Sequence, residues 1–143
     1  LFSEAITAVV RPGHPLLMDQ DAAANLASYP LVVPPPGAVI ATTVQAFLAR
    51  HAIAAHSAAY ETVSLAFGRK IVQASDAVWF ISEGVVRDET RAGTLVKLAL
   101  RDVLRGPPVG VSMRSSDDFG DAQKGLVAAL EAACKDNLPG NAV

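Results

Sequence analysis

Short apolar runs alternate with stretches of helical periodicity along most of this chain. Ala5–Val10, Leu31–Val33 and Ala77–Ile81 are apolar and bounded by turn-forming residues, which predicts three buried strands. A helix over 38–50 is predicted because its apolar residues recur at i, i+4, i+7 and i+8, the spacing of one helical face. Strands that alternate with helices pair in parallel through right-handed crossovers, so the pattern indicates an α/β fold.

The segment 60–82 carries this pattern most clearly, as strand, helix and strand. The helix has a capping residue in Thr62 or Ser64, and a polar loop at Glu83–Gly84 follows the second strand. That loop and the one at Pro34–Gly37 both follow strands of the predicted sheet, so we expect them at one edge. Open α/β sheets bind small molecules outside the carboxyl ends of their strands. The sequence therefore predicts a small-molecule site at this edge.

The last third of the chain is less regular. Five charged residues in and beside Gly84–Gly93 predict a solvated turn, and Leu95–Leu100 alternates as a half-exposed strand. Gly106–Pro108 predicts a break before another strand at Val109–Met113. An amphipathic helix closes the chain, and its predicted inner stripe comprises Phe119, Ala122, Leu126, Leu130 and Ala133.

Composition narrows the possible environment and partners. The 143 residues are 51% apolar, enough for one domain, and the net charge of -2 with scattered Lys and Arg provides no basic surface for nucleic acid. A single cysteine, Cys134, excludes an internal disulfide and suits the reducing cytoplasm. Prolines interrupt the uncharged stretch Ala22–Ala49, so no membrane association is predicted.

Signatures of enzymes and metal sites are absent from the sequence. It contains no Gly-x-Ser-x-Gly, His-Glu-x-x-His, Walker or Gly-x-Gly-x-x-Gly motif. Glu61 and Asp76 bracket a predicted helix by its two ends, too far apart for shared acid-base chemistry. His51 and His56 have no cysteine nearby to complete a zinc site. We therefore expect no catalytic residue, no metal and no cofactor.

Four stretches occur in a characteristic order: Val9–Leu16, Tyr29–Val33, Glu61–Ser82 and Gly93–Leu98. Together they resemble the effector-binding domain of bacterial LysR-type transcriptional regulators. Within that family the likeness is to regulators of aromatic-acid catabolism in the protocatechuate pathway (PcaQ-like) and to related sugar-responsive regulators. The likeness extends over nearly the whole chain.

The resemblance implies a periplasmic-binding-protein type II-like fold, with two α/β lobes joined by crossing strands at 1–10 and 95–100. Residues 1–5 would come from the first lobe, 6–100 would form one complete Rossmann-like lobe, and 101–143 would return to the first lobe as a strand and a helix. The chain begins without Met, inside a predicted strand. We accordingly expect it to be part of a longer protein, with a DNA-binding helix-turn-helix before Leu1.

The resemblance also implies an effector cleft lined by the two loops. Helix starts attract anions and Gly37 permits close approach, which suits a carboxylate, whereas Glu83 repels anions and can instead accept hydrogen bonds from a sugar or phenol. The alternative is a proline-rich connector and a solvated turn without a ligand. The candidate effector-binding residues are Gly37, Ala38, Val39, Ile40, Thr42, Thr43, Ser82, Glu83 and Gly84.

Arg11 and His14 are two further candidates, because Arg11 can pair with a carboxylate in bidentate fashion. The alternative is that they belong to an ordinary surface turn.

These features predict a cytoplasmic ligand-sensing domain that binds a small carboxylated aromatic or ring-cleavage metabolite, or less favourably a sugar. We expect a homodimer or homotetramer, with the helix at 38–50 or the one at 119–133 in the contact. Two alternatives of other classes share the two-lobed fold: a solute-binding protein of a transport system, and an α/β enzyme such as a dehydratase.

Overall fold

A computed structural model of the chain describes residues 1–54, 58–112 and 120–137. It divides into two compact units, Glu4–Gly106 and a second made of Leu1–Ser3 with Pro107–Val143. The elements are β1 (Phe2–Val10), η1 (Pro15–Met18), α1 (Ala22–Asn25), η2 (Leu26–Ser28), β2 (Leu31–Val33), α2 (Ala41–Arg50), β3 (Ala58–Glu61), α3 (Leu65–Ala74), β4 (Val78–Ser82), η4 (Glu83–Val86), α4 (Arg87–Arg91), β5 (Val96–Lys97), β6 (Leu104–Val109) and α5 (Asp121–Asn137).

One mixed sheet organises the unit Glu4–Gly106. The described strands follow the order β3-β2-β4-β1-β5, and β6 also pairs with β1. β2 is parallel to both β3 and β4, as the alternation of strands and helices predicts, whereas β1 runs antiparallel to β4 and β5. Because β2, β3 and β4 point the same way, the loops that follow them lie at one edge of the sheet.

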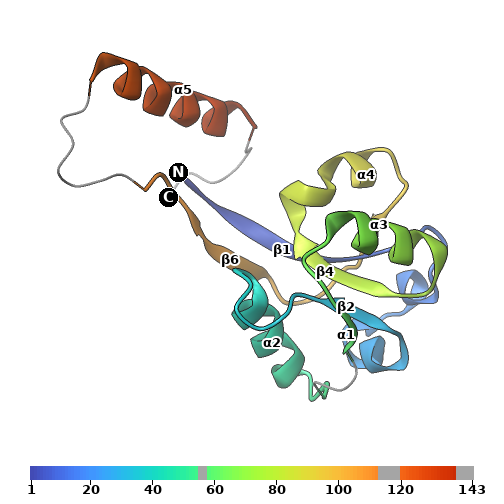
Figure 1. Ribbon diagram of the computed structural model, residues 1–143. Helices are drawn as coiled ribbons and strands as arrows, with labels where there is room; N and C mark the ends of the chain where they lie inside the picture. Colours follow the sequence, from blue (N-terminus) through green and yellow to red (C-terminus); the bar gives the residue numbers. More distant parts are fainter. Residues whose placement is uncertain (55–57, 113–119, 138–143) are drawn as a thin grey trace. The chain divides into compact units, whose positions relative to one another are not determined.

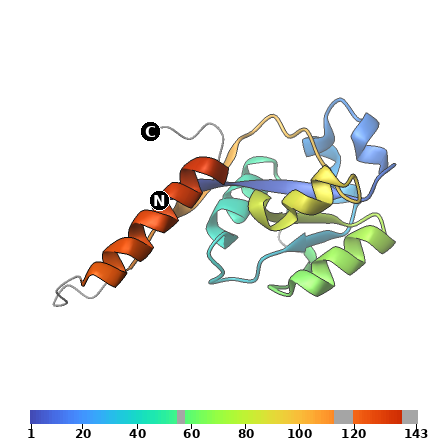
Figure 2. The ribbon, with the colours of Figure 1, turned by 90° about the horizontal axis from the view of Figure 1, so that it is seen from above.

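Helices cover both faces of this sheet (Figures 1 and 2). On one face α1 and α2 pack onto a core that includes Val10, Leu31 and Phe80. On the other face α3 and η4 cover a smaller core around Trp79 and Val72. β2 and β4 are therefore apolar on both faces, which explains their uninterrupted apolar sequence.

Close packing of α3 onto the sheet depends on Gly68. A Cβ atom at this position would lie 2.5 Å from Cζ2 of Trp79, so a larger residue would push the helix off the indole ring. Ser64 caps the same helix, since its hydroxyl accepts a hydrogen bond from the Phe67 amide at 3.3 Å. The capping residue predicted from the sequence is thus in place.

Three predictions for the last third of the chain are wrong. Gly84–Gly93 is not a plain turn, because η4 and α4 occupy most of it with Val86 buried beneath them. The strand predicted at Leu95–Leu100 is reduced to Val96–Lys97, and the next strand spans Leu104–Val109 across the predicted break. Prolines are tolerated there because an edge strand does not need every amide for pairing.

The smaller unit contains the chain start, the end of β6 and α5. The terminal ammonium of Leu1 donates a hydrogen bond to the Val109 carbonyl at 2.8 Å. The side chains of Leu126 and Leu130 are exposed, which contradicts the inner stripe predicted for α5, and Phe119 lies outside the described residues.

Candidate functional site

A pocket of about 190 Å³ lies where the three parallel strands end. The loops after β2 and β3 and the last residues of β4 supply its walls. It is lined by Pro34, Ala38, Val39, Ile40, Thr62, Val63, Leu65, Trp79, Phe80, Ile81 and Ser82. We call this cavity the edge pocket; its position is the one that the topology of the sheet predicts for a ligand.

The edge pocket is mainly apolar. Val39 and Val63 are 79% and 71% exposed, far more than is usual for aliphatic side chains, and Leu65 is 40% exposed. Polar side chains are contributed by Thr62 and Ser82, and none of the described lining residues carries a charge. Such a pocket suits a ligand with an apolar body and few polar groups.

Two helices begin beside the edge pocket. α2 follows the loop that contains Ala38 and Ile40, and α3 begins at Leu65, which itself lines the pocket. The first amides of a helix have no partner within it, so both starts favour negative charge. The pocket thus offers an anion partial positive charge from the backbone without a cationic side chain.

Gly37 adopts a positive φ of 86° in the loop before α2. A Cβ atom there would meet nothing within 4 Å, so the turn itself is what requires glycine. Gly37 itself is not among the residues that line the edge pocket, although its neighbour Ala38 is.

The two threonines of this loop do not line the edge pocket. Thr42 is exposed, and the hydroxyl of Thr43 donates a hydrogen bond to the Arg105 carbonyl at 3.2 Å. The structure therefore brings Ala38, Val39 and Ile40 to the pocket and directs Thr43 toward β6.

The three candidate residues at the end of β4 have different surroundings. They are Ser82, Glu83 and Gly84. Ser82 lines the edge pocket, while Glu83 forms an ion pair with Lys97 and lines a different cavity. The Gly84 amide donates to a Glu4 carboxylate oxygen at 2.7 Å, and a Cβ atom at Gly84 would lie 2.2 Å from that oxygen. Of the three, Ser82 is the one that faces the edge pocket.

The cavity beside Glu83 measures about 400 Å³ and lies between β1 and the connection from β5 to β6. We call it the bulge cavity. It is lined by Ala5, Ile6, Thr7, Glu83, Lys97, Leu98, Ala99, Leu100, Asp102, Val103 and Leu104. Asp102 also accepts a hydrogen bond from His51 Nε2 at 2.9 Å, and this bond holds the pKa of the Asp102 carboxyl below its ordinary value.

Arg11 and His14 lie at the opposite edge of the sheet, because β1 runs antiparallel to β4. Arg11 pairs with Asp76, which precedes β4, at 2.6 Å. His14 is 1% exposed and uses both ring nitrogens: Nε2 lies 3.1 Å from the Asp76 carbonyl and Nδ1 accepts from the Leu16 amide. The structure does not bring these two residues to the edge pocket.

Sequence reasoning missed the third loop of the edge pocket. Thr62, Val63 and Leu65 follow β3 and line the pocket, as does Trp79 of β4. The signal was present in the sequence, because the rule that places the loops after β2 and β4 at one edge applies equally to the loop after β3.

Metal binding and membrane insertion find no support in the described residues. Among them, no three His, Cys, Asp or Glu side chains come together in an arrangement that could hold a metal ion, and His56 lies outside them. In the same part of the chain, no helix is both long and apolar enough to cross a membrane.

The family follows from comparison with known proteins. The model of the LysR substrate binding domain matches residues 1–135. The chain belongs to this family. The predictions of a LysR-type effector-binding domain and of a periplasmic-binding-protein type II-like α/β fold are therefore confirmed.

Named relatives are regulators. The chain is 40% identical over 131 residues to the HTH-type transcriptional regulator PcaQ of Agrobacterium fabrum, covering 91% of this chain and 40% of that protein. It is 31% identical over 130 residues to the uncharacterized HTH-type transcriptional regulator YdcI of Escherichia coli, covering 91% of this chain and 42% of that protein. The chain thus spans about 40% of the length of these relatives. They are transcriptional regulators and not enzymes, as predicted.

Solved structures share the fold at low sequence identity. The regulatory domain of CcmR from Synechocystis PCC6803, in complex with 2-PG, superposes with a TM-score of 0.72 at 15% identity, covering 97% of this chain and 66% of that chain. Full-length HypT from Salmonella typhimurium, a hypochlorite-specific LysR-type regulator, gives 0.64 at 14% identity, covering 96% of this chain and 46% of that chain.

Proposed function

We propose that this LysR substrate-binding domain senses a small carboxylated aromatic or ring-cleavage acid in the edge pocket. The observation that supports this most directly is the combination of apolar walls, two hydroxyls and two helix starts, without a charged lining residue among those described. The apolar body of the ligand would pack against Val39, Val63 and Leu65. Its carboxylate would accept hydrogen bonds from helix-start amides and from Thr62 or Ser82.

A sugar fits the edge pocket less well. Sugars present hydroxyl groups on several sides, and each buried hydroxyl needs a hydrogen-bonding partner. The described lining offers Thr62 and Ser82 as polar side chains, and Glu83, which could have accepted further hydrogen bonds, points into the bulge cavity. An acid with an apolar ring or chain leaves fewer polar groups unpaired.

We propose a regulatory context in which the whole protein binds DNA through a helix-turn-helix outside this chain and acts as a homodimer or homotetramer in the cytoplasm. The effector must bind one arrangement of the protein more tightly than another, since otherwise no equilibrium shifts. Of the two helices predicted to contribute to subunit contact, α5 exposes its leucines, whereas Val44 and Phe47 of α2 are buried. A strict monomer in light scattering at high concentration would contradict the proposed association of subunits.

The same fold would suit a solute-binding protein of a transport system. The named relatives are transcriptional regulators, which favours the sensor. The residues encoded immediately before Leu1 discriminate between the two, because a helix-turn-helix indicates a regulator and a secretory signal indicates transport.

Calorimetric titration tests the ligand class. We would titrate the chain with 3,4-dihydroxybenzoate, cis,cis-muconate, glucose and benzyl alcohol, the last as an aromatic control without a carboxylate. We expect at least one acid to bind and both neutral compounds to bind more weakly. Absence of heat and of a thermal shift with every acid, or tighter binding of glucose, contradicts the proposal.

A further inference from the structure

α2 connects the edge pocket with the start of β6. The loop at its amino end contributes Ala38, Val39 and Ile40 to the pocket. That loop is continuous with the helix, because the Ala41 amide donates to the Ala38 carbonyl at 2.9 Å and the Val44 amide to the Ile40 carbonyl at 3.1 Å. Ten residues of helix then span about 15 Å to the opposite end. A displacement of the loop is therefore transferred to the whole helix.

Two polar contacts hold α2 to β6 and to the segment that leads into it. The Thr43 hydroxyl donates to the Arg105 carbonyl at 3.2 Å. At the carboxyl end, His51 Nε2 lies 2.9 Å from Asp102 Oδ2, and an Arg50 guanidinium nitrogen lies 3.7 Å from the same oxygen. The side chains of His51 and Asp102 are 27% and 33% exposed, so their hydrogen bond can break without opening the apolar core.

Phe47 fixes the orientation of the imidazole. Its ring lies 4.5 Å from the His51 ring and 5.6 Å from that of Phe80, measured between centroids. His51 is thus positioned by the core on one side and presents Nε2 to Asp102 on the other.

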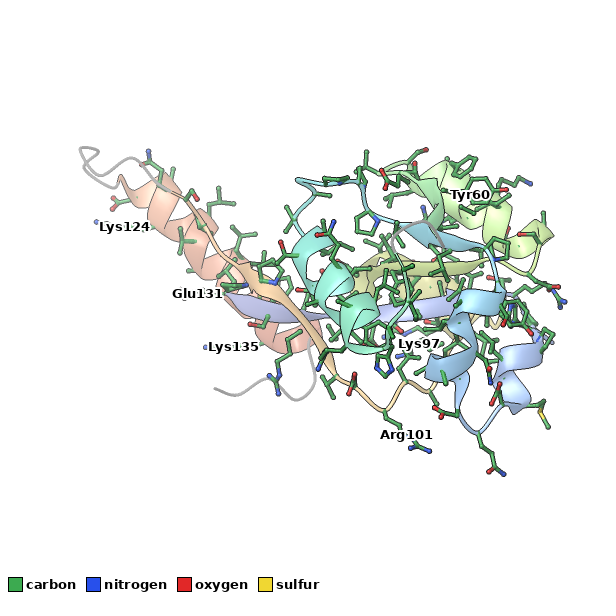
Figure 3. All side chains as sticks on the ribbon, turned by 90° about the horizontal axis from the view of Figure 1, so that it is seen from below. Tyr60, Lys97, Arg101, Lys124, Glu131 and Lys135 are labelled. Carbon is green, nitrogen blue, oxygen red and sulfur yellow. The ribbon has the colours of Figure 1, made fainter. Side chains whose placement is uncertain are left out.

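The connection that carries Asp102 has room to move. Leu98–Leu104 borders the bulge cavity of about 400 Å³, whose other walls include β1 and the Glu83–Lys97 ion pair. Arg101 points away from the sheet, so its side chain does not fill that space (Figure 3). The cavity is the space into which the connection would move if its hydrogen bond with α2 were broken.

We propose that His51 and Asp102 form a latch through which α2 transmits occupancy of the edge pocket to β6. His51 and Asp102 are positioning residues, since neither borders the pocket. The part of this mechanism that involves a ligand rests on the proposed function. The contacts that join the pocket loop, α2 and β6 are present in the chain without ligand. By linkage, a ligand that favours one position of α2 also favours one state of the latch.

Hydrogen exchange of the ligand-free chain tests the latch on its own. His51→Ala and Asp102→Ala should raise backbone amide exchange roughly two- to fivefold, the range for losing a partly exposed ionic hydrogen bond. The rise should occur at 101–106 and also at 38–43, at the other end of α2. His51→Gln keeps a donor at the position of Nε2 and should behave like the natural chain. Asp76→Ala, which removes an aspartate of the opposite edge, should change neither segment.

A rise confined to the residues beside each substitution overturns the latch, because a local structural role would not reach 38–43. A rise of the same size in His51→Gln also overturns it, because the hydrogen bond would then not be the link.

Ligand titration then separates the latch from the proposed function. With 3,4-dihydroxybenzoate as the probe, the natural chain should bind and show altered exchange at 101–106. His51→Ala should still bind but lose that distant effect. If the natural chain binds none of the acids, the proposed ligand class is wrong. The exchange pattern of the ligand-free chain still decides whether His51 and Asp102 form the latch. Binding with an unchanged distant effect in His51→Ala overturns the latch and leaves the proposed function intact.

Discussion

At the amino-terminal edge of the three parallel strands, Arg11, His14 and Asp76 bond to one another and to the backbone, whereas at the carboxyl-terminal edge the pocket is walled by exposed aliphatic side chains. The first edge has the residues that usually hold carboxylates and uses them for the fold. The second edge has none of those side chains among its described lining, yet it has the open volume and the helix starts.

The contrast shows that side-chain type alone does not locate an anion site. Arg11 and His14 looked suitable because their chemistry matches a carboxylate. Their hydrogen bonds are already made within the protein, with Asp76 and with the Leu16 amide. A group that stabilises a turn through such bonds is not available to a ligand without cost to the fold.

His14→Ala should have the largest effect on stability. The substitution leaves a buried void and removes the acceptor of the Leu16 amide, so we expect a loss of about 2–3 kcal/mol in the free energy of unfolding. Urea denaturation measures this loss. Ligand affinity of the folded variant should stay unchanged.

His51→Ala is the matched control, because its ring is 27% exposed and the change should cost less stability. A His14→Ala variant with normal stability but weaker ligand binding would reverse the roles that we assign to the two edges.

Gly68→Ala should disturb stability and binding together. The added Cβ would lie 2.5 Å from the Trp79 ring, which lines the edge pocket, so either the helix or the indole must move. We expect a loss of about 1–3 kcal/mol in the free energy of unfolding and weaker ligand binding. Calorimetry and thermal unfolding measure the two effects.

Gly125→Ala in α5 provides the comparison, since a Cβ there meets nothing within 4 Å and alanine favours a helix. Equal effects of the two substitutions would mean that packing on Trp79 is unimportant.

The sequence predicts the edge pocket better than it predicts the contacts around it. The order of strands and helices is sufficient to place Ala38 and Ser82 at the carboxyl ends of neighbouring parallel strands, since that depends on chain direction. The partners of Glu83 and Thr43 depend on tertiary contacts with Lys97 and Arg105, which local patterns do not encode.

The helical turns at 83–91 were missed for a related reason. Their charges suggested a solvated turn, but Glu89 is held by Arg69 of α3, and the Thr90 hydroxyl bonds to the Arg87 carbonyl. The buried Val86 then anchors the segment to the core. Only the folded sheet brings α3 close enough to supply the arginine.

Val39→Glu should weaken acid binding about tenfold with little change in stability. Val39 lines the edge pocket and is 79% exposed, so a carboxylate there stays solvated in the free protein but repels an anionic ligand. Val39→Lys is the matched control and should bind the same acid at least as tightly as the natural chain. Calorimetry at low ionic strength measures both. Equal affinities in the two variants would show that the anion does not bind beside Val39.

The smallest expected effect is that of pH on the free energy of unfolding. Hydrogen bonds from Arg69 and His51 hold the pKa values of Glu89 and Asp102 below their ordinary values of 4.5 and 3.8. Both carboxylates are therefore more acidic in the folded chain than in the unfolded chain. Their contribution to the free energy of unfolding is fully present above pH 4.5 and is lost as the pH falls through their lower folded values. Urea denaturation at a series of pH values should show this decline, and it should be shallower in Glu89→Gln. In His51→Gln, which has no imidazole at the latch, affinity for a strong aromatic acid such as a benzenesulfonate, which stays ionised, should remain constant from pH 7 to about pH 5, because no described residue that lines the pocket titrates there. A change in that affinity would mean that an ionisable group outside the described lining contacts the ligand.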